Sequence, residues 1–210
     1  RSHDEAKRHI DIAFDIAREF DADIDMHVDE TDDPNSRSLE YLAEKTIAEG
    51  HQGRVTAGHT CALAAYSDDY AREVIRKVKL AEINMITNPA TNLVIQGRGD
   101  RQPIRRGITR VKELLAAGVN VTFGQDCVDD AFYPFGRADM LEVALITAHA
   151  AQLTTPAEIE TLFKMMTTNA ARTLGVLDDY GIAVGKRADI IIMDAESPKD
   201  AIRRQVNRRY

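Results

Sequence analysis

The sequence predicts an α/β fold, namely the second half of a (β/α)8 barrel. Three strand-like segments each place a potential catalytic side chain near the point where the strand stops: His27 with Glu30 close behind it, His59, and Asp126. Barrels of this type gather catalytic groups at the carboxyl ends of their strands. Helical and strand-like segments also alternate over residues 4–152, which is typical of a parallel sheet. Only four strands are evident in the 210 residues, whereas a complete barrel takes about 250 residues.

The first elements follow from the spacing of apolar residues. A helix is predicted near the amino end, where residues repeat at helical spacing: Ile10, Ala13, Ile16, Ala17 and Phe20. A strand is predicted at 23–29, whose side chains should alternate between two faces. The set expected to pack outward on helices is Ile24, Met26 and Val28. The set expected to point into the barrel is Asp25, His27 and Asp29. A helix at 38–49 should end at Gly50, a residue that favours left-handed helix termini.

The same reasoning predicts the later elements. Thr155, Pro156 and Glu158 fit the N-cap, N1 and N3 positions of one further helix. We expect Asn88-Pro89 to end the third strand. The other strands are expected at 54–58, 83–87 and 119–124, and the other helices at 68–81, 107–117, 137–152 and 169–174.

The pattern changes from Tyr180 onward. Residues 185–194 read as a turn followed by one β-prone strand, with no crossover helix expected after it. We therefore expect two units. Residues 1–178 form the second half of the barrel, and residues 179–210 form part of a small β domain with the C-terminal segment.

Composition excludes several classes of protein. The chain is 44% hydrophobic and 29% charged, with a net charge of −7. This acidic balance disfavours nucleic acid and anionic membranes as partners. No apolar run approaches the roughly 20 residues of a membrane span, and no signal peptide is evident. The two cysteines, Cys61 and Cys127, make no disulfide framework, so the expected location is the cytoplasm.

The residues at the strand ends indicate a metal site only when they are considered together. A single His on a strand is more often a structural residue than a ligand, and Glu30 by itself reads as a solvated carboxylate. Together, His27 and Asp126 are two potential metal ligands, with Glu30 as an acid and His59 as a further imidazole. Such ligands suit Zn²⁺ or Fe²⁺ rather than Ca²⁺ or Mg²⁺. Cys127 follows Asp126 directly, and a structural role and a substrate contact are equal alternatives for it.

Several segments resemble the amidohydrolase superfamily, and within it the bacterial cytosine deaminases. The resemblance runs in order along nearly the whole chain. The matching segments are DMHVDETDD at 25–33, RVTAGHT at 54–60, NP at 88–89, QGR at 96–98, RRGITRVKE at 105–113, FGQD at 123–126, YP at 133–134, YGI at 180–182 and RRQV at 203–206.

The resemblance implies a TIM barrel of the metal-dependent hydrolase type with one divalent metal ion, Fe²⁺ or Zn²⁺. It implies hydrolytic deamination of a pyrimidine base, cytosine or 5-methylcytosine. The metal ligands would be His27 and Asp126. The catalytic residues would be Glu30, His59 and Asp126, with Glu30 carrying protons to the ring after burial beneath a bound base has raised its pKa. The substrate-binding residues would be Glu30, His59, Cys127 and Phe132.

The chain also departs from the family pattern. The family's His-x-His metal pair and its substrate-binding Gln are absent, and we expect both upstream of Arg1. The protein should therefore need an N-terminal half for activity, and we expect a homo-oligomer. Cytosine deaminases usually carry His-Asp-Asp where this chain has Gln125-Asp126-Cys127, and often Trp where Phe132 stands. A larger and more apolar pocket predicts a substrate with an extra apolar group, of which 5-methylcytosine is the simplest.

Two alternatives remain open. The same scaffold could deaminate another cyclic amidine, such as isoguanine, creatinine or a triazine. Alternatively, the chain could be a non-catalytic half-barrel with a structural or regulatory role. The absent His pair favours that second alternative, whereas the presence of Glu30, His59 and Asp126 argues against it.

Overall fold

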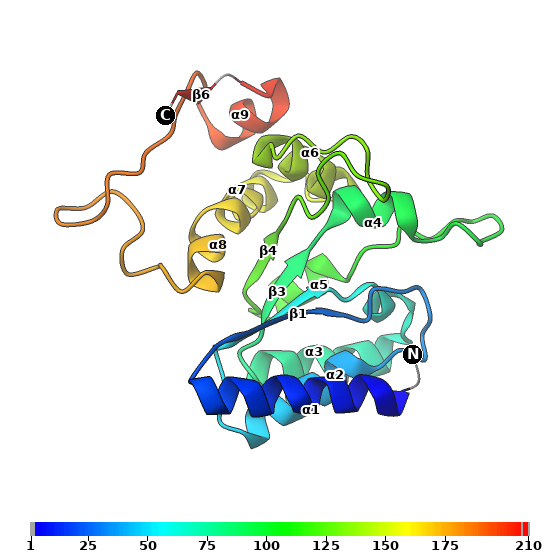
Figure 1. Cartoon of the computed structure of the whole chain (residues 1–210). Coiled ribbons are helices and arrows are strands. Elements are labelled where there is room, and N and C mark those ends of the chain that lie inside the picture. Colours follow the sequence, from blue (N-terminus) through cyan, green and yellow to red (C-terminus); the bar gives the residue numbers. More distant parts are fainter. Residues whose placement is uncertain (1–2, 207, 210) are drawn as a thin grey trace.

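A parallel sheet of four strands, in chain order, forms the centre of the structure, a computed structural model that describes residues 3–206 and 208–209 (Figure 1). All four predicted strands are present. They are β1 (Ile24–Val28), β2 (Val55–His59), β3 (Asn84–Thr87) and β4 (Val121–Phe123). Because neighbouring strands are parallel, their carboxyl ends meet at one edge of the sheet.

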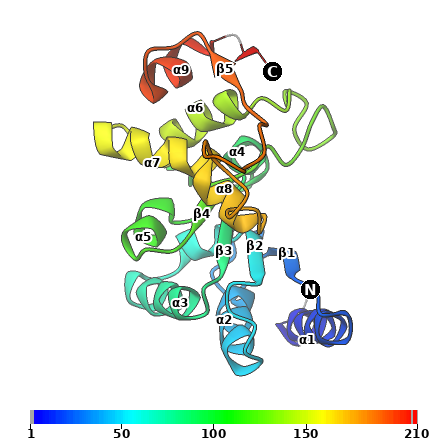
Figure 2. The ribbon, with the colours of Figure 1, turned by 90° about the vertical axis from the view of Figure 1, so that its left-hand side faces the viewer.

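Helices connect the strands and cover the sheet. Helices α1, α2 and α3 lie side by side along one face, as Figures 1 and 2 both show. No helix within the described ranges is long and apolar enough to cross a lipid bilayer. The helices up to β4 are α1 (His3–Phe20), α2 (Ser38–Ala48), η1 (Cys61–Ala65, a 3₁₀ helix), α3 (Asp68–Leu80), α4 (Pro89–Ile95) and α5 (Val111–Ala116). Those after β4 are α6 (Met140–Ala150), α7 (Pro156–Met166) and α8 (Thr168–Thr173).

The alternation of side chains on β1 is confirmed. Ile24 and Val28 are buried with the helices, whereas Asp25 and His27 are exposed. The period of two residues along a strand therefore sends the apolar set to the core and the polar set to the opposite face. His27 therefore lies exposed on this opposite face.

Two helices differ from the predictions. Residues 89–95 form α4, because the proline at 89 begins a helix at its first position instead of merely ending the strand. Helix α5 starts at Val111 instead of residue 107, since Gly107 adopts a left-handed backbone with φ 70°. An added Cβ there would lie 2.4 Å from Cβ of Gln96, so the close approach also requires glycine.

The C-terminal segment contains a short antiparallel pair, β5 (Ile192–Met193) with β6 (Arg208–Arg209). Between them lies α9 (Pro198–Arg204), which joins two antiparallel strands and is therefore not a crossover helix. The Ser197 side chain caps this helix by accepting a hydrogen bond from the Asp200 N–H, at 3.1 Å. Ala201 and Ile202 are buried, and α9 packs on α6 and α7. The division into two units stays a prediction.

Asp29 does not point into the barrel as predicted. Its backbone is left-handed, with φ 48°, and its carboxylate turns back toward the start of α2. There it accepts hydrogen bonds from the Ser38 N–H at 3.1 Å, the Leu39 N–H at 2.8 Å and the Ser36 hydroxyl at 2.7 Å. The first N–H groups of a helix have no partner within it, so Asp29 satisfies two of them from a distance.

Asp29→Ala should therefore lower the free energy of unfolding of the complete protein by about 1–2 kcal/mol, because α2 loses this cap. Chemical denaturation measures the difference. Asp33→Ala is the matched control, since this exposed carboxylate accepts bonds only within its own loop, from Asn35. An Asp29→Ala protein as stable as the control would show that the cap contributes nothing.

Candidate metal and catalytic site

The backbone places two histidines side by side at one end of the sheet. The register pairs His27 of β1 with Gly58 of β2, and Val28 with His59. His59 ends its strand in the left-handed region, with φ 68°, and Asp126 beyond β4 adopts φ 64°. Such conformations are uncommon for residues other than glycine, and they cluster at functional sites.

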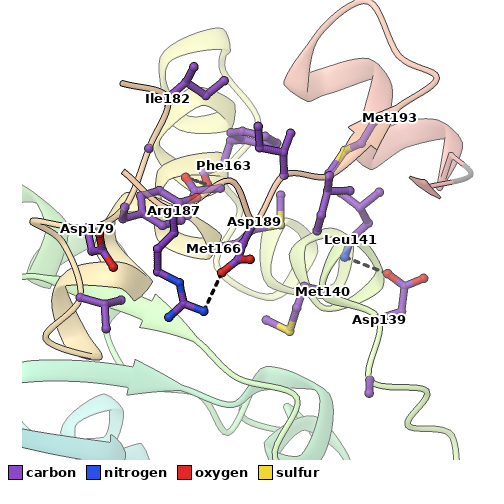
Figure 3. A pocket seen from close by; sticks show the side chains of 17 residues that line it. Asp139, Met140, Leu141, Phe163, Met166, Asp179, Ile182, Arg187, Asp189 and Met193 are labelled. Carbon is purple, nitrogen blue, oxygen red and sulfur yellow. Dashed lines mark hydrogen bonds and ion pairs between the residues drawn. The ribbon is translucent and has the colours of Figure 1, made fainter. Parts of the chain in front are cut away.

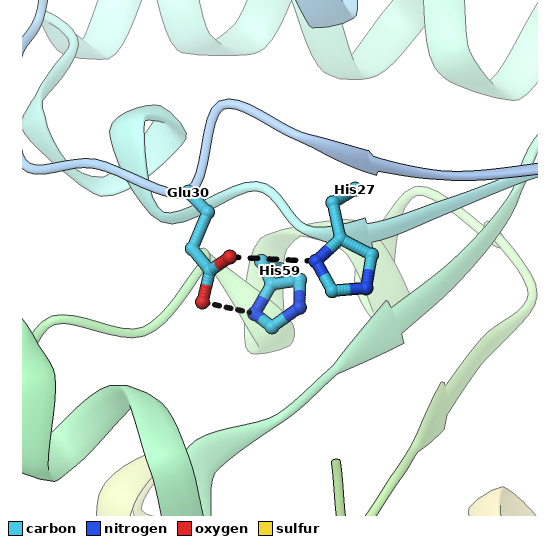
Figure 4. A group of neighbouring side chains, drawn as sticks. All are labelled: His27, Glu30 and His59. Atoms are coloured by element: carbon cyan, nitrogen blue, oxygen red, sulfur yellow. Dashed lines mark ion pairs between the residues drawn. The ribbon is translucent and has the colours of Figure 1, made fainter. Parts of the chain in front are cut away.

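Glu30 links the two imidazoles (Figure 4). Its Oε1 lies 3.0 Å from Nδ1 of His59, and its Oε2 lies 3.4 Å from Nδ1 of His27. The ring centroids of the two histidines are 4.4 Å apart. The three side chains differ greatly in exposure: 69% for His27, 27% for Glu30 and 1% for His59. The site thus runs from an open face into the core.

Asp126 adjoins this group through His59. Its Oδ1 lies 3.8 Å from Nε2 of His59, and its side chain is 15% exposed. The three residues whose ligand atoms all lie within 4.8 Å of one another are His27, Glu30 and His59. The structure therefore brings together three of the four strand-end residues and places the fourth next to them. The assignment of His27 and Asp126 as the metal pair stays a prediction.

The charges of Glu30 and His59 are coupled. Burial raises the pKa of the Glu30 carboxyl, but hydrogen bonds and charge from His59 and His27 more than offset this, so its pKa lies below the ordinary value. Burial lowers the pKa of His59, yet Glu30 and Asp126 outweigh it and the pKa lies above the usual range. Two imidazoles thus stabilise the charged form of Glu30, and the raised pKa expected beneath a bound base stays a prediction.

The donor set fits a divalent transition metal. Imidazole nitrogen and carboxylate oxygen are the ligands that Zn²⁺ and Fe²⁺ accept. His27 presents an accessible ring on the open face, and the carboxylates of Glu30 and Asp126 flank the buried His59. This arrangement leaves His27 available to a metal and leaves acid–base groups beside it.

Two amides of this site were not predicted. Asn88 Nδ2 lies 3.1 Å from Nε2 of His59, and Asn92 Nδ2 lies 3.3 Å from Oε1 of Glu30 and 3.1 Å from Nδ1 of His59. Both asparagines are buried, at the start of α4. Their four-residue spacing, directly after a strand, puts both on one side of a helix and could have indicated them.

The two cysteines differ. Cys61 is 1% exposed and belongs to the core. The Cys127 Sγ lies 3.8 Å from Oδ2 of Asp126, at the site. Burial raises the pKa of Cys127 to about 11, and the charges of Asp126 and Asp130 act in the same direction. The thiol is therefore neutral at neutral pH.

Phe132 lies in the loop after β4 with 64% of its surface exposed, and its N–H donates to Asp130 at 2.9 Å. This hydrogen bond joins two residues of the same loop. Three other histidines have contacts or exposure of their own: His9 is exposed, His51 Nε2 lies 3.1 Å from the Ala22 carbonyl, and His149 Nδ1 lies 2.7 Å from the Leu145 carbonyl.

A separate cavity of about 670 Å³ lies beside α6 and α7, under the segment that leads to β5 (Figure 3). Met140, Phe163 and Met166 contribute apolar walls, and an ion pair of 3.0 Å joins Arg187 to Asp189 at its edge. The strand-end residues do not line it. The size of this cavity therefore has no bearing on the chemistry at His59.

The comparisons with known proteins agree with this geometry. The model of the amidohydrolase family matches residues 1–210. The N-isopropylammelide isopropyl amidohydrolase of Pseudomonas sp. strain ADP is 34% identical over 203 residues, covering 95% of this chain and 46% of that protein. The pterin deaminase of Rhizobium rhizogenes is 37% identical over 174 residues, covering 82% of this chain and 39% of that protein.

A solved structure shows the same fold. The crystal structure of the 5-methylcytosine deaminase from Klebsiella pneumoniae, liganded with 5-fluorocytosine, has a TM-score of 0.96 and 38% identity. The match covers 99% of this chain and 50% of that one, so the chain spans about half the length of the relatives it matches. The predicted TIM-barrel α/β fold is thereby confirmed. The chain belongs to the amidohydrolase family.

Proposed function

We propose that the complete protein containing this chain is a metal-dependent hydrolytic deaminase of a pyrimidine base, with 5-methylcytosine preferred to cytosine. The observation that carries the proposal is the Glu30 carboxylate held between His27 and His59 at the carboxyl ends of adjacent strands. The relatives support a hydrolytic deamination, since two of them are named as deaminases of ring substrates.

His27 and Asp126 would hold the metal ion, together with ligands from the rest of the protein. When bound, a divalent metal lowers the pKa of water from 15.7 to about 7, which supplies a nucleophile at neutral pH. The exposed ring of His27 is accessible for this role.

The other residues would move protons. His59 Nε2 faces Asp126 Oδ1 at 3.8 Å, so these two groups would orient the attacking water and accept its proton. Glu30 would give its proton to the ring nitrogen as C4 is attacked, take a proton from the hydroxyl that C4 has gained, and pass it to the departing ammonia; the proton accepted by His59 and Asp126 would then restore the protonated Glu30. A base bound against Glu30 excludes water from the carboxyl, and this burial favours the protonated form that donation requires.

Cys127 supports the choice of base. A carboxylate at this position would be charged, whereas the Cys127 thiol is neutral because its pKa is raised to about 11. A neutral, polarisable sulfur next to Asp126 gives an apolar wall that suits a methyl group. The resemblance to a protein named as a 5-methylcytosine deaminase agrees with this.

A substrate panel tests the proposal. The complete protein should prefer 5-methylcytosine to cytosine by about 10- to 200-fold in kcat/KM, the range that one methyl group provides in an apolar pocket. Cys127→Asp should remove most of that preference, and Cys61→Ala, which removes the chain's other thiol, should keep it. Faster deamination of cytosine than of its 5-methyl form would refute the preference.

A second candidate is hydrolysis of a triazine or pterin ring, favoured by the names of two relatives at 34% and 37% identity. Including N-isopropylammelide and a pterin in the same panel decides between the candidates. A complete protein that releases no amine from any of these bases would favour the non-catalytic half-barrel.

A further inference from the structure

Asn88 stands at the N-cap of α4, but its side chain does not cap the helix. An asparagine at this position ordinarily accepts a hydrogen bond from the second or third helical N–H. Here its Nδ2 lies 3.1 Å from Nε2 of His59, and the residue is 6% exposed. The amide is therefore directed to the imidazole instead of to its own helix.

Gly124 provides the space for this amide. A Cβ added to Gly124 would lie 2.7 Å from Oδ1 of Asn88, closer than real Cβ contacts, and 3.5 Å from Cγ2 of Ile86. The backbone at Gly124 does not have a positive φ, so glycine is required here for space and not for its conformational freedom. Gly124, just after β4, thus lies against Oδ1 of the Asn88 amide, while Nδ2 of the same amide faces His59.

The partners of the ring are consistent with one neutral tautomer. At Nδ1, the Glu30 carboxylate oxygen at 3.0 Å can only accept while it is ionised, so Nδ1 carries the proton. Asn92 Nδ2, 3.1 Å from Nδ1, then donates to the same Glu30 oxygen, at 3.3 Å. At Nε2, the Asn88 N–H needs an acceptor, and an unprotonated Nε2 provides it.

One group acts in the opposite direction. Asp126 Oδ1, 3.8 Å from Nε2, favours a proton on that nitrogen. The Asn88 N–H lies closer to Nε2 and offers a donor where Asp126 offers an acceptor. Asn88 at Nε2 therefore acts together with Glu30 at Nδ1 in favour of the form with its proton on Nδ1.

We propose that Asn88, seated over Gly124, is a positioning residue that fixes the His59 ring with its proton on Nδ1. This tautomer leaves Nε2 as the nitrogen that can accept a proton. The inference rests on the proposed function only for its consequence in catalysis, since the placement of the ring is a property of the protein itself.

The tautomer can be read directly from ring ¹⁵N chemical shifts of the complete protein labelled at histidine, at a pH that keeps the ring neutral. The resonances missing from a His59→Gln variant assign His59. The wild-type ring should carry its proton on Nδ1. Asn88→Asp replaces the donor by an acceptor of the same shape, so Nε2 should now carry a proton. An unchanged tautomer in Asn88→Asp would overturn the inference.

Gly124→Ala tests the same contact without removing the amide. The added methyl should displace the Asn88 side chain, so this variant and Asn88→Ala should each lower kcat by about 10- to 100-fold, the range for groups that orient a site imidazole. The loss should fall on kcat and not on KM. The double variant should be no worse than either single one. Fully additive losses would contradict a shared mechanism.

Asn84→Ala is the matched control. This buried asparagine begins β3, the strand that Asn88 follows, and there it accepts a hydrogen bond from Asn120 at 2.8 Å. It should lower stability and leave the His59 tautomer and kcat unchanged.

The outcomes also separate the two proposals. A shifted tautomer in an enzyme that deaminates no base supports the positioning role and refutes the function, whereas an active deaminase with an unshifted tautomer does the reverse.

Discussion

Replacing Glu30 with Gln should lower kcat for deamination by about 10²–10⁴-fold, the contribution of a positioned acid–base group. The amide has the shape of the carboxyl but cannot carry a proton between water, ring nitrogen and leaving ammonia. It also cannot accept from both imidazoles as an ion, so the contacts at 3.0 and 3.4 Å weaken. Metal content should stay unchanged, since His27 and Asp126 are the ligands in this account.

Glu40→Gln is the control for that variant. Its side chain is 25% exposed, close to the 27% of Glu30, and it also forms an ion pair, with Lys77 at 2.6 Å. Its carboxylate accepts hydrogen bonds from Tyr70 and Lys77 of α3 and none from the site histidines, so its loss should affect stability and leave kcat within a few-fold. Ammonia release and elemental analysis measure both variants. Retained activity in Glu30→Gln would exclude a proton-carrying role, and lost metal would make Glu30 a ligand.

His27→Ala should remove the metal and, with it, nearly all activity. The loss in metal affinity should exceed the roughly 10- to 100-fold cost of changing an outer-shell partner, because a direct ligand disappears. The side chain is 69% exposed, so its removal leaves no cavity in the core and should change stability little. Metal titration of the complete protein measures the affinity.

His149→Ala is the control for this second variant. It removes an exposed imidazole whose Nδ1 lies 2.7 Å from the carbonyl oxygen of Leu145, one turn earlier in the same helix. Metal affinity should not change. A His27→Ala protein that binds metal as tightly as this control would show that His27 is not a ligand.

The sequence predicts the convergence at this site well, for simple geometric reasons. Parallel strands end at one edge, so a His at the end of each of two neighbours must lie close to the other; the ring centroids of His27 and His59 are 4.4 Å apart. Capping chemistry is equally local, and the predicted box of Thr155 and Glu158 is confirmed at α7.

The unpredicted features depend on contacts between distant segments. Asn88 marked the end of a strand in the sequence, but only the packing of β4 shows that its amide faces His59. Asp29 alternates with the core residues of β1, yet its left-handed backbone sends it to cap α2. The lowered pKa of Glu30 likewise arises from two imidazoles on different strands. Local pattern can place Asn88 and Asn92 on one side of a helix, but it does not show which distant residues that side contacts.

The central claim is that one divalent metal ion is held where these strand ends meet. Anomalous diffraction from crystals of the complete protein, collected at the zinc and iron edges, tests it directly. We expect one peak per chain within about 2.0–2.2 Å of a His27 ring nitrogen and an Asp126 carboxylate oxygen. Active crystals with no peak, or with a peak bound by other residues, would contradict the account.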